Sequence, residues 1–155
     1  DSSGIGVVRC VVCGTVLETS SYELSDEEKA QLYKSSCEWV AYDELARNPN
    51  SYVGHLVCFE GEVIQVQESN SILYYSTYRI NVTKHTYTYL DDEWWDDTVY
   101  VNYDSYNADS RILEDDVVMF YGEFQGLKTY TTIMGGSVTI PYVIAEYIDY
   151  EYSTD

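Results

Sequence analysis

Basic residues are scarce in this chain, and their scarcity narrows the functions that it can perform. Only 8 of its 155 residues are Lys or Arg, against 27 Asp and Glu, so the formal net charge is −19 at pH 7. A chain with this charge is repelled by phosphate backbones and anionic membranes unless its few cations gather on one face. The net charge therefore argues against nucleic acid as a partner.

Long apolar runs are also missing. No stretch approaches 18 consecutive apolar residues, and no charged segment followed by an apolar one opens the chain, so the sequence predicts neither a membrane-spanning helix nor a signal segment. Because the sequence begins at Asp1 rather than Met, we expect a trimmed or processed product whose missing part could have held a signal or a lipid anchor. The length suits one compact domain, with or without a short extension.

The chain has only two histidines and two prolines. His55 and His85 have no Cys or Ser at a spacing typical of a catalytic triad, and the carboxylates are scattered over predicted turns. We therefore expect no enzyme, although a pair of carboxylates acting as acid and base stays open in principle. With so little proline, 18 tyrosines and many β-branched residues, the composition favours strands over helices.

Two helices are predicted ahead of the strands. Ser25 and Glu28 have the Ser-x-x-Glu spacing of a capping box, which predicts a helix over residues 26–37. A second, short helix over residues 42–47 should end at Asn48 and Pro49. Residues 25–50 thus form a helical extension in front of the strands, and residues 1–24 form a leading segment to which no structure is assigned.

From residue 52 onward, apolar and polar residues alternate with a period of two, which predicts five strands. Gly61 marks a bend or bulge in the first strand, and Pro141 marks an edge or bulge in the last. The five strands lie within residues 55–69, 71–83, 97–104, 115–126 and 135–150. Their predicted apolar faces include Tyr78, Ile80 and Val82 in the second strand, Val99, Val101 and Tyr103 in the third, and Val117, Met119 and Tyr121 in the fourth.

Five strands with a bent first strand predict a mostly β fold. The pattern is typical of the OB-fold, a partly open Greek-key barrel, here over residues 51–150 and followed by an acidic tail over residues 151–155. A five-stranded SH3-like barrel is the structural alternative.

Several motifs in one order, between about residues 37 and 149, carry a resemblance to a known family. A helix ending in Ala-Arg-Asn-Pro leads through Tyr52 and Gly54 into the first strand, and GGSVTIP, residues 135–141, opens the fifth. The segments YDELARNPNSYVGHLVCFEGEVIQVQE, RILEDDVVMFYGEFQG and TYTTIMGGSVTIPYVIAEYI together resemble a mostly uncharacterised family of OB-fold domains in Gram-positive surface proteins and lipoproteins, with a more distant similarity to a clostridial toxin-operon negative regulator. The resemblance implies an extracytoplasmic location, secreted or anchored at the cell surface, and no cofactor.

OB-folds bind ligands on the face of strands two and three and on the loops that flank it. This rule predicts the ligand-binding residues Tyr74, Tyr78, Arg79, Lys84, Trp94, Trp95, Tyr100, Lys128 and Tyr130, with Tyr75 and Tyr103 as further aromatic residues on the same strands. Our first interpretation is a non-catalytic binding module for a protein or a glycan. The alternative is a single-stranded nucleic-acid binder that gathers Arg79, Lys84 and Lys128 in one groove, because such ligands need stacking and cations together.

The segment LDDEWWDD, residues 90–97, is predicted to be a loop and has five acidic residues around Trp94 and Trp95. The order of ligands in a calcium loop is absent, and we assign no metal site to it, although clustered carboxylates keep calcium open. Exposed tryptophans could instead stack on a sugar or anchor a partner. In a third interpretation, one Trp covers an end of the barrel and the acids keep the loop solvated.

The four cysteines leave three alternatives open. Cys10 and Cys13 form CVVCG, which resembles half of a zinc knuckle, but no second Cys-x-x-Cys follows and structural zinc needs four ligands. Together with Cys37 and Cys58, they permit disulfides in an oxidising location, free buried thiols, or a zinc site.

Overall fold

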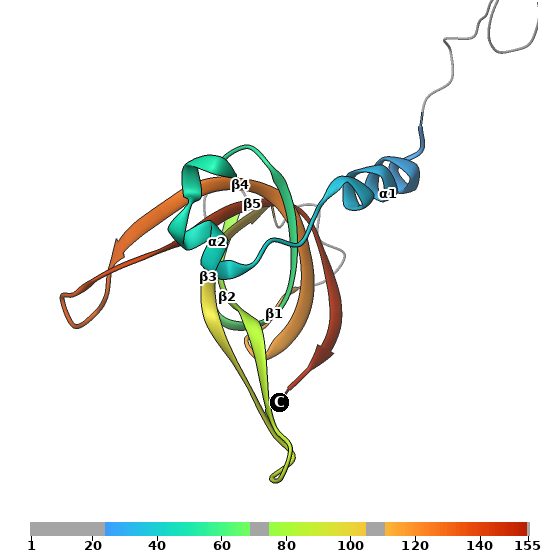
Figure 1. Ribbon diagram of the computed structural model, residues 1–155. Coiled ribbons are helices and arrows are strands. Elements are labelled where there is room, and N and C mark those ends of the chain that lie inside the picture. The colour runs from blue at the N-terminus through green and yellow to red at the C-terminus, as the bar shows by residue number, and fades with distance from the viewer. Residues whose placement is uncertain (1–23, 69–74, 105–110, 155) are drawn as a thin grey trace, which may run out of the picture. The chain divides into compact units, whose positions relative to one another are not determined.

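The computed structural model describes residues 24–68, 75–104 and 111–154 (Figure 1). All the strands lie in one compact unit, Tyr33–Asp155. The helical elements are α1 (Asp26–Ser36), α2 (Tyr42–Arg47) and a short 3-10 helix, η1 (Pro49–Ser51). The strands are β1 (Leu56–Gln67), β2 (Tyr75–Tyr87), β3 (Asp92–Asp104), β4 (Asp116–Thr131) and β5 (Ser137–Ser153).

Both predicted helices are confirmed. At the start of α1, the Ser25 N–H donates to Glu28 Oε1 at 3.1 Å and the Glu28 N–H donates to Ser25 Oγ at 3.2 Å, which is the reciprocal capping box. Helix α2 ends where the Asn48 N–H donates to the Glu44 carbonyl, immediately before Pro49. Its apolar contact is Leu45, which is fully buried. Among the described residues, no helix is long and apolar enough to cross a membrane.

The strands close into a barrel in the order β1-β2-β3-β5-β4. Neighbours are antiparallel except β3 and β5, which run parallel over Tyr100–Tyr103 and Tyr142–Ala145. Placing β5 between β3 and β4 gives the Greek-key connection, so the fold is the OB-fold rather than the SH3-like alternative.

Strand β1 changes partners close to Gly61, where the sequence predicted a bend or bulge, but its register shift lies farther on, between Val63 and Gln65. Its first half pairs with β4 as far as Glu62, and from Glu62 onward it pairs with β2. A Cβ at Gly61 would collide with the Asn81 carbonyl oxygen and lie 2.6 Å from Ile80 Cγ2. Glycine therefore lets β2 approach β1 closely at this position.

The barrel core confirms the predicted faces of β2 and β3 and corrects that of β4. Buried residues include Tyr78 and Ile80 of β2 and Val99, Val101 and Tyr103 of β3. In β4, Val117 is buried, but Met119 and Tyr121 are only half-buried, and the core side chains are Val118, Phe120 and Phe124. A register shift between Val117 and Val118 buries two successive valines, and this bulge reverses the alternation that the sequence suggested.

Strands β2, β3, β4 and β5 each extend beyond one of their predicted ends, and β4 runs on to Thr131. The segment LDDEWWDD is mostly strand, because only residues 88–91 turn and β3 already begins at Asp92. His85, which lies beyond the predicted end of the second strand at residue 83, belongs to β2. Strand β5 continues through Ser153, so residues 151–153 of the expected acidic tail belong to it. In Figure 1 the β2–β3 hairpin, yellow-green, and the β4–β5 hairpin, orange to red, extend beyond the ring of strands.

Pro141 lacks a backbone N–H, and it lies in β5 at a position where no hydrogen bond to β3 is lost. It pairs with Leu127 of β4, and the stretch of β5 that pairs with β3 begins only at the next residue, Tyr142. One side of β5 is therefore an edge up to Pro141, as the sequence predicted.

Candidate ligand-binding face

The β2–β3 hairpin is a two-stranded ribbon whose sides follow from its register. Arg79 lies opposite Tyr100, and the same register continues to His85 opposite Trp94. Because Tyr78, Ile80, Val99 and Val101 point into the core, Arg79 and Tyr100 point outward. By the same alternation, His85 and Trp94 lie on the outward side of the ribbon. We call this side the outer face.

Five side chains from four strands meet on the outer face, and we call them the cation–tyrosine cluster: Arg79, Tyr100, Lys128, Tyr130 and Tyr142. The Arg79 guanidinium lies 4.2 Å from the centre of the Tyr130 ring. Lys128 Nζ lies 5.0 Å from the Tyr100 ring centre and 5.4 Å from that of Tyr142. The rings of Tyr100 and Tyr142 pack edge to face with centres 5.4 Å apart. All five residues are half-buried, so each still presents surface to a ligand.

A chain of hydrogen bonds fixes the polar groups beside this cluster. Thr77 Oγ1 donates to Asn102 Oδ1 at 3.0 Å, and Asn102 Nδ2 donates to the Tyr142 hydroxyl at 2.8 Å. Burial raises the pKa of Tyr142, so its phenol stays protonated near neutral pH. The hydroxyl can therefore still donate its own proton, for example to a ligand oxygen.

The cluster is free of acidic residues in a chain that is otherwise rich in them. Residues 124–145 contain no Asp or Glu, and the positions flanking Arg79 and Tyr100 on the outer face are Thr77, Asn81, Thr98 and Asn102. Within the described ranges, Lys34, Lys84 and Arg111 pair with carboxylates, whereas Arg79 and Lys128 form no such ion pair. The nearest acidic residues along the ribbon are Asp96 and Asp97 of β3, and the Asp97 carboxylate accepts a hydrogen bond from the Thr83 hydroxyl. Two cations thus remain available to a ligand.

A second aromatic group, the Trp94 platform, comprises His85, Tyr87 and Trp94 farther along the same outer face. The His85 and Trp94 rings stack with centres 4.8 Å apart and planes 16° apart. Tyr87 adds its ring 4.9 Å from Trp94. Trp94 is 40% exposed and Tyr87 is 55% exposed, so the platform presents ring surface to solvent.

The structure brings together four of the predicted ligand residues: Arg79, Tyr100, Lys128 and Tyr130. It places Tyr75 exposed at the start of β2 and Trp94 on the platform. Tyr74 lies outside the described residues. Sequence reasoning missed Tyr142, Thr77 and Asn102, which the pairing of β3 with β2 and β5 adds to the face.

Other predicted residues are in the wrong place for an outer-face ligand. Tyr78 and Tyr103 are only 3% and 5% exposed and belong to the core. Lys84 and Trp95 lie on the opposite side of the ribbon, because they alternate with His85 and Trp94. There, Lys84 Nζ pairs with Glu93 at 2.8 Å and lies 5.8 Å from the Trp95 ring centre. Of the three cations that the sequence predicted in one groove, only Arg79 and Lys128 therefore lie together on the outer face.

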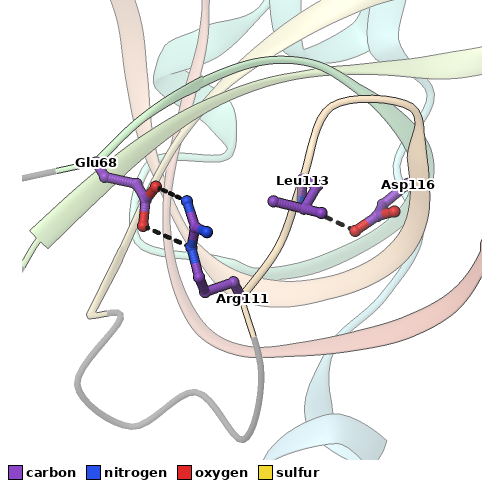
Figure 2. Close-up of polar contacts among 4 residues, drawn as sticks. All are labelled: Glu68, Arg111, Leu113 and Asp116. Atoms are coloured by element: carbon purple, nitrogen blue, oxygen red, sulfur yellow. Dashed lines mark hydrogen bonds and ion pairs between the residues drawn. The ribbon is translucent and has the colours of Figure 1, made fainter.

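Arg111 is a further cation, but it forms an ion pair within the protein and is therefore not free to bind a ligand. Figure 2 shows that its guanidinium donates hydrogen bonds to both carboxylate oxygens of Glu68. This ion pair joins the end of β1 to the segment before β4. In the same segment, the buried Asp116 carboxylate accepts the Leu113 N–H at 2.8 Å and so closes the turn into β4.

The described cysteines, Cys37 and Cys58, are half-buried free thiols. Burial raises the pKa of Cys37 to about 11 and also raises that of Cys58, so both stay protonated and react slowly. Cys10 and Cys13 lie outside the described residues. In the described part of the chain, no three His, Cys, Asp or Glu side chains gather as a metal site would require, and LDDEWWDD is no exception.

Elsewhere on the barrel, two carboxyl groups share a proton. The pKa of Glu151 is raised to about 7, chiefly by a hydrogen bond to Glu60 and further by burial and by the charges of Glu60 and Asp149. The folded state therefore holds this proton more tightly than the unfolded state, whose value is near 4.5. The contribution of Glu151 to stability should be fully present below pH 4.5, fall as the pH rises to about 7, and be absent above that.

We expect Glu151→Gln to flatten this pH dependence and to raise stability at pH 8. The gain should be less than about 1 kcal/mol, because water screens exposed carboxyl pairs. Urea unfolding at a series of pH values measures it, with Glu146→Gln as a control that removes an exposed carboxylate from the same strand. Parallel pH curves for the wild type and Glu151→Gln would contradict the shared proton.

Comparisons with known proteins leave the function open. No protein-family model matches the chain, and no curated protein matches it. A crystal structure of a small single-stranded DNA-binding protein from Streptomyces coelicolor is similar, with a TM-score of 0.46 and 16% sequence identity. The similarity covers 63% of this chain and 94% of that one.

Proposed function

We propose that this chain is a non-catalytic binding module whose outer face holds a glycan with anionic groups. The observation that carries the proposal is the cation–tyrosine cluster, in which Arg79 and Lys128 lie against tyrosine rings without a carboxylate partner. In keeping with the family resemblance, we place this activity outside the cytoplasm.

The chemistry of the cluster suits a sugar chain. The rings of Tyr100, Tyr130 and Tyr142 offer half-exposed faces for the C–H side of a sugar ring, while Asn102 and Thr77 supply hydrogen-bonding groups held in fixed positions. Arg79 and Lys128 can each donate a charge-assisted hydrogen bond to a carboxylate or phosphate on the glycan.

Binding of a fluorescein-labelled hyaluronan octasaccharide, which alternates uronate and neutral amino-sugar units, tests this function by fluorescence anisotropy. We expect Arg79→Ala and Lys128→Ala each to weaken binding about tenfold, the loss of roughly one charged hydrogen bond. The matched control is Lys84→Ala, which removes the same charge from the same ribbon but from its opposite side. If Arg79→Ala and Lys84→Ala weaken binding equally, only the net charge of the protein matters and the outer face is not the binding site. That result would refute the proposal.

Single-stranded nucleic acid is a second candidate, because stacking rings interleaved with unpaired cations are what such a ligand needs. With two cations available, the logarithm of its affinity should fall with the logarithm of salt concentration at a slope of about −1.4. Titrating a labelled oligo-dT at several salt concentrations measures this slope. Saturable binding of oligo-dT that Arg79→Ala abolishes, with no binding of hyaluronan, would favour nucleic acid over the glycan.

A further inference from the structure

The Trp94 platform is built before any ligand arrives. Trp94 is held by His85, stacked on it at 4.8 Å, and by Tyr87 at 4.9 Å, and both partners come from the neighbouring strand. Rings that already pack against one another lose little further freedom when a ligand stacks on them. Nevertheless, Trp94 and Tyr87 keep 40% and 55% of their surface exposed.

The position of the platform relates it to the cation–tyrosine cluster. Both lie on the outer face of one ribbon, and Trp94 precedes Tyr100 by six residues in β3. At about 3.3 Å per residue, their positions are roughly 20 Å apart along the strand. Between them, Thr98 donates to Asn81 at 2.6 Å, so the intervening surface offers polar groups to a chain that crosses it. An extended polymer could therefore contact both places.

The charges around the platform differ from those around the cluster. On the same side of the ribbon, Asp92 lies opposite Tyr87 and Asp96 lies two residues after Trp94, and both are exposed. Two carboxylates beside the rings repel an anionic group, but they accept hydrogen bonds from hydroxyl groups. A ring stacked on Trp94 should therefore be neutral and rich in hydroxyls.

We propose that the Trp94 platform is a second subsite, which stacks a neutral sugar unit of the same glycan whose anionic unit lies on the cation–tyrosine cluster. This inference rests on the proposed function, because it takes the ligand to be a glycan. It adds an order along the ribbon, in which the anionic unit lies at the barrel and the neutral unit lies toward the hairpin end. It also assigns to Trp94 a role that Trp95, on the opposite side of the ribbon, does not share.

Two probes of different charge test the two subsites separately. For the neutral probe chitotriose, we expect quenching of tryptophan fluorescence that Trp94→Ala abolishes and Arg79→Ala preserves. For the hyaluronan octasaccharide, we expect Trp94→Ala to weaken binding about tenfold, whereas binding of a hyaluronan disaccharide, too short to reach from the cluster to the platform, should be unchanged. Trp39→Ala is the matched control, because Trp39 is 67% exposed and lies outside the ribbon.

The outcomes separate this inference from the proposed function. If Arg79→Ala weakens octasaccharide binding but Trp94→Ala and Trp39→Ala behave alike, the function stands and the second subsite is wrong. If no hyaluronan binds, the proposed function fails, and chitotriose quenching that depends on Trp94 would still support a neutral-sugar site. If chitotriose fails to bind as well, both fail. Partial recovery by Trp94→Phe, with an unchanged melting temperature in every variant, excludes a folding defect.

Discussion

Gly122→Ala is expected to unfold the barrel, or to lower its free energy of unfolding by about 3 kcal/mol or more. Gly122 is buried at a point where β4 lies very close to β5. A Cβ there would collide with the Ile144 carbonyl oxygen and lie 2.7 Å from Ala145 Cα. These are backbone atoms of a paired strand, so they cannot move aside without opening the β4–β5 pairing.

Urea and thermal unfolding, followed by circular dichroism, measure this effect. The matched control is Gly136→Ala, whose Cβ would lie 3.6 Å from Thr132 Oγ1, an ordinary contact in an exposed turn. We expect the control to change stability by less than about 0.5 kcal/mol. Equal stabilities of the two variants would show that the close approach of β4 and β5 is not the constraint described here.

Phe120→Ala should have the next largest effect, lowering the free energy of unfolding by about 3–5 kcal/mol. Phe120 is completely buried and packs against Phe59 with ring centres 5.7 Å apart, so truncation leaves a cavity in the middle of the barrel. Met119→Ala, one residue earlier, should cost less than about 1 kcal/mol because Met119 is half-buried on the outer side of β4.

The same unfolding measurements distinguish the two faces of β4. Phe120→Leu serves as a milder variant that keeps most of the apolar volume and should remain folded. If Met119→Ala lowered the free energy of unfolding more than Phe120→Ala, Met119 would face the core, as simple alternation predicted.

Local signals in the sequence predicted the elements of this fold well. The capping box at Ser25 and Glu28 and the stop at Pro49 depend on neighbouring residues only, and the structure confirms both helices. Strict alternation in β2 and β3 likewise placed Ile80 and Val101 correctly in the core. The face of β4 was wrong because the bulge at Val117 depends on how β4 pairs with β5, where Val117 lies opposite Tyr152, far from it in the sequence.

The candidate face was only partly predictable, for a related reason. Arg79, Tyr100, Lys128 and Tyr130 could be named because the OB-fold rule points to their strands. Tyr142 was missed because it reaches the face through the parallel pairing of β3 with β5, which leaves no local pattern in the sequence. Trp94 and Trp95 are adjacent in sequence, so only the extended length of β3 shows that they lie on opposite sides of the ribbon.

Residues 124–145 contain no acidic residue, in a chain with a net charge of −19. This uneven distribution of charge affects how the protein is oriented when it approaches a charged surface. Within the outer face, Asp92 and Asp96 lie beside the Trp94 platform, whereas the cation–tyrosine cluster contains no acidic residue, so the charge of the barrel is unevenly distributed and gives an electric dipole. Near a negatively charged surface, within a Debye length of about 8 Å at physiological salt, this dipole exerts a torque. We expect the end of the outer face that holds the cation–tyrosine cluster to turn toward such a surface.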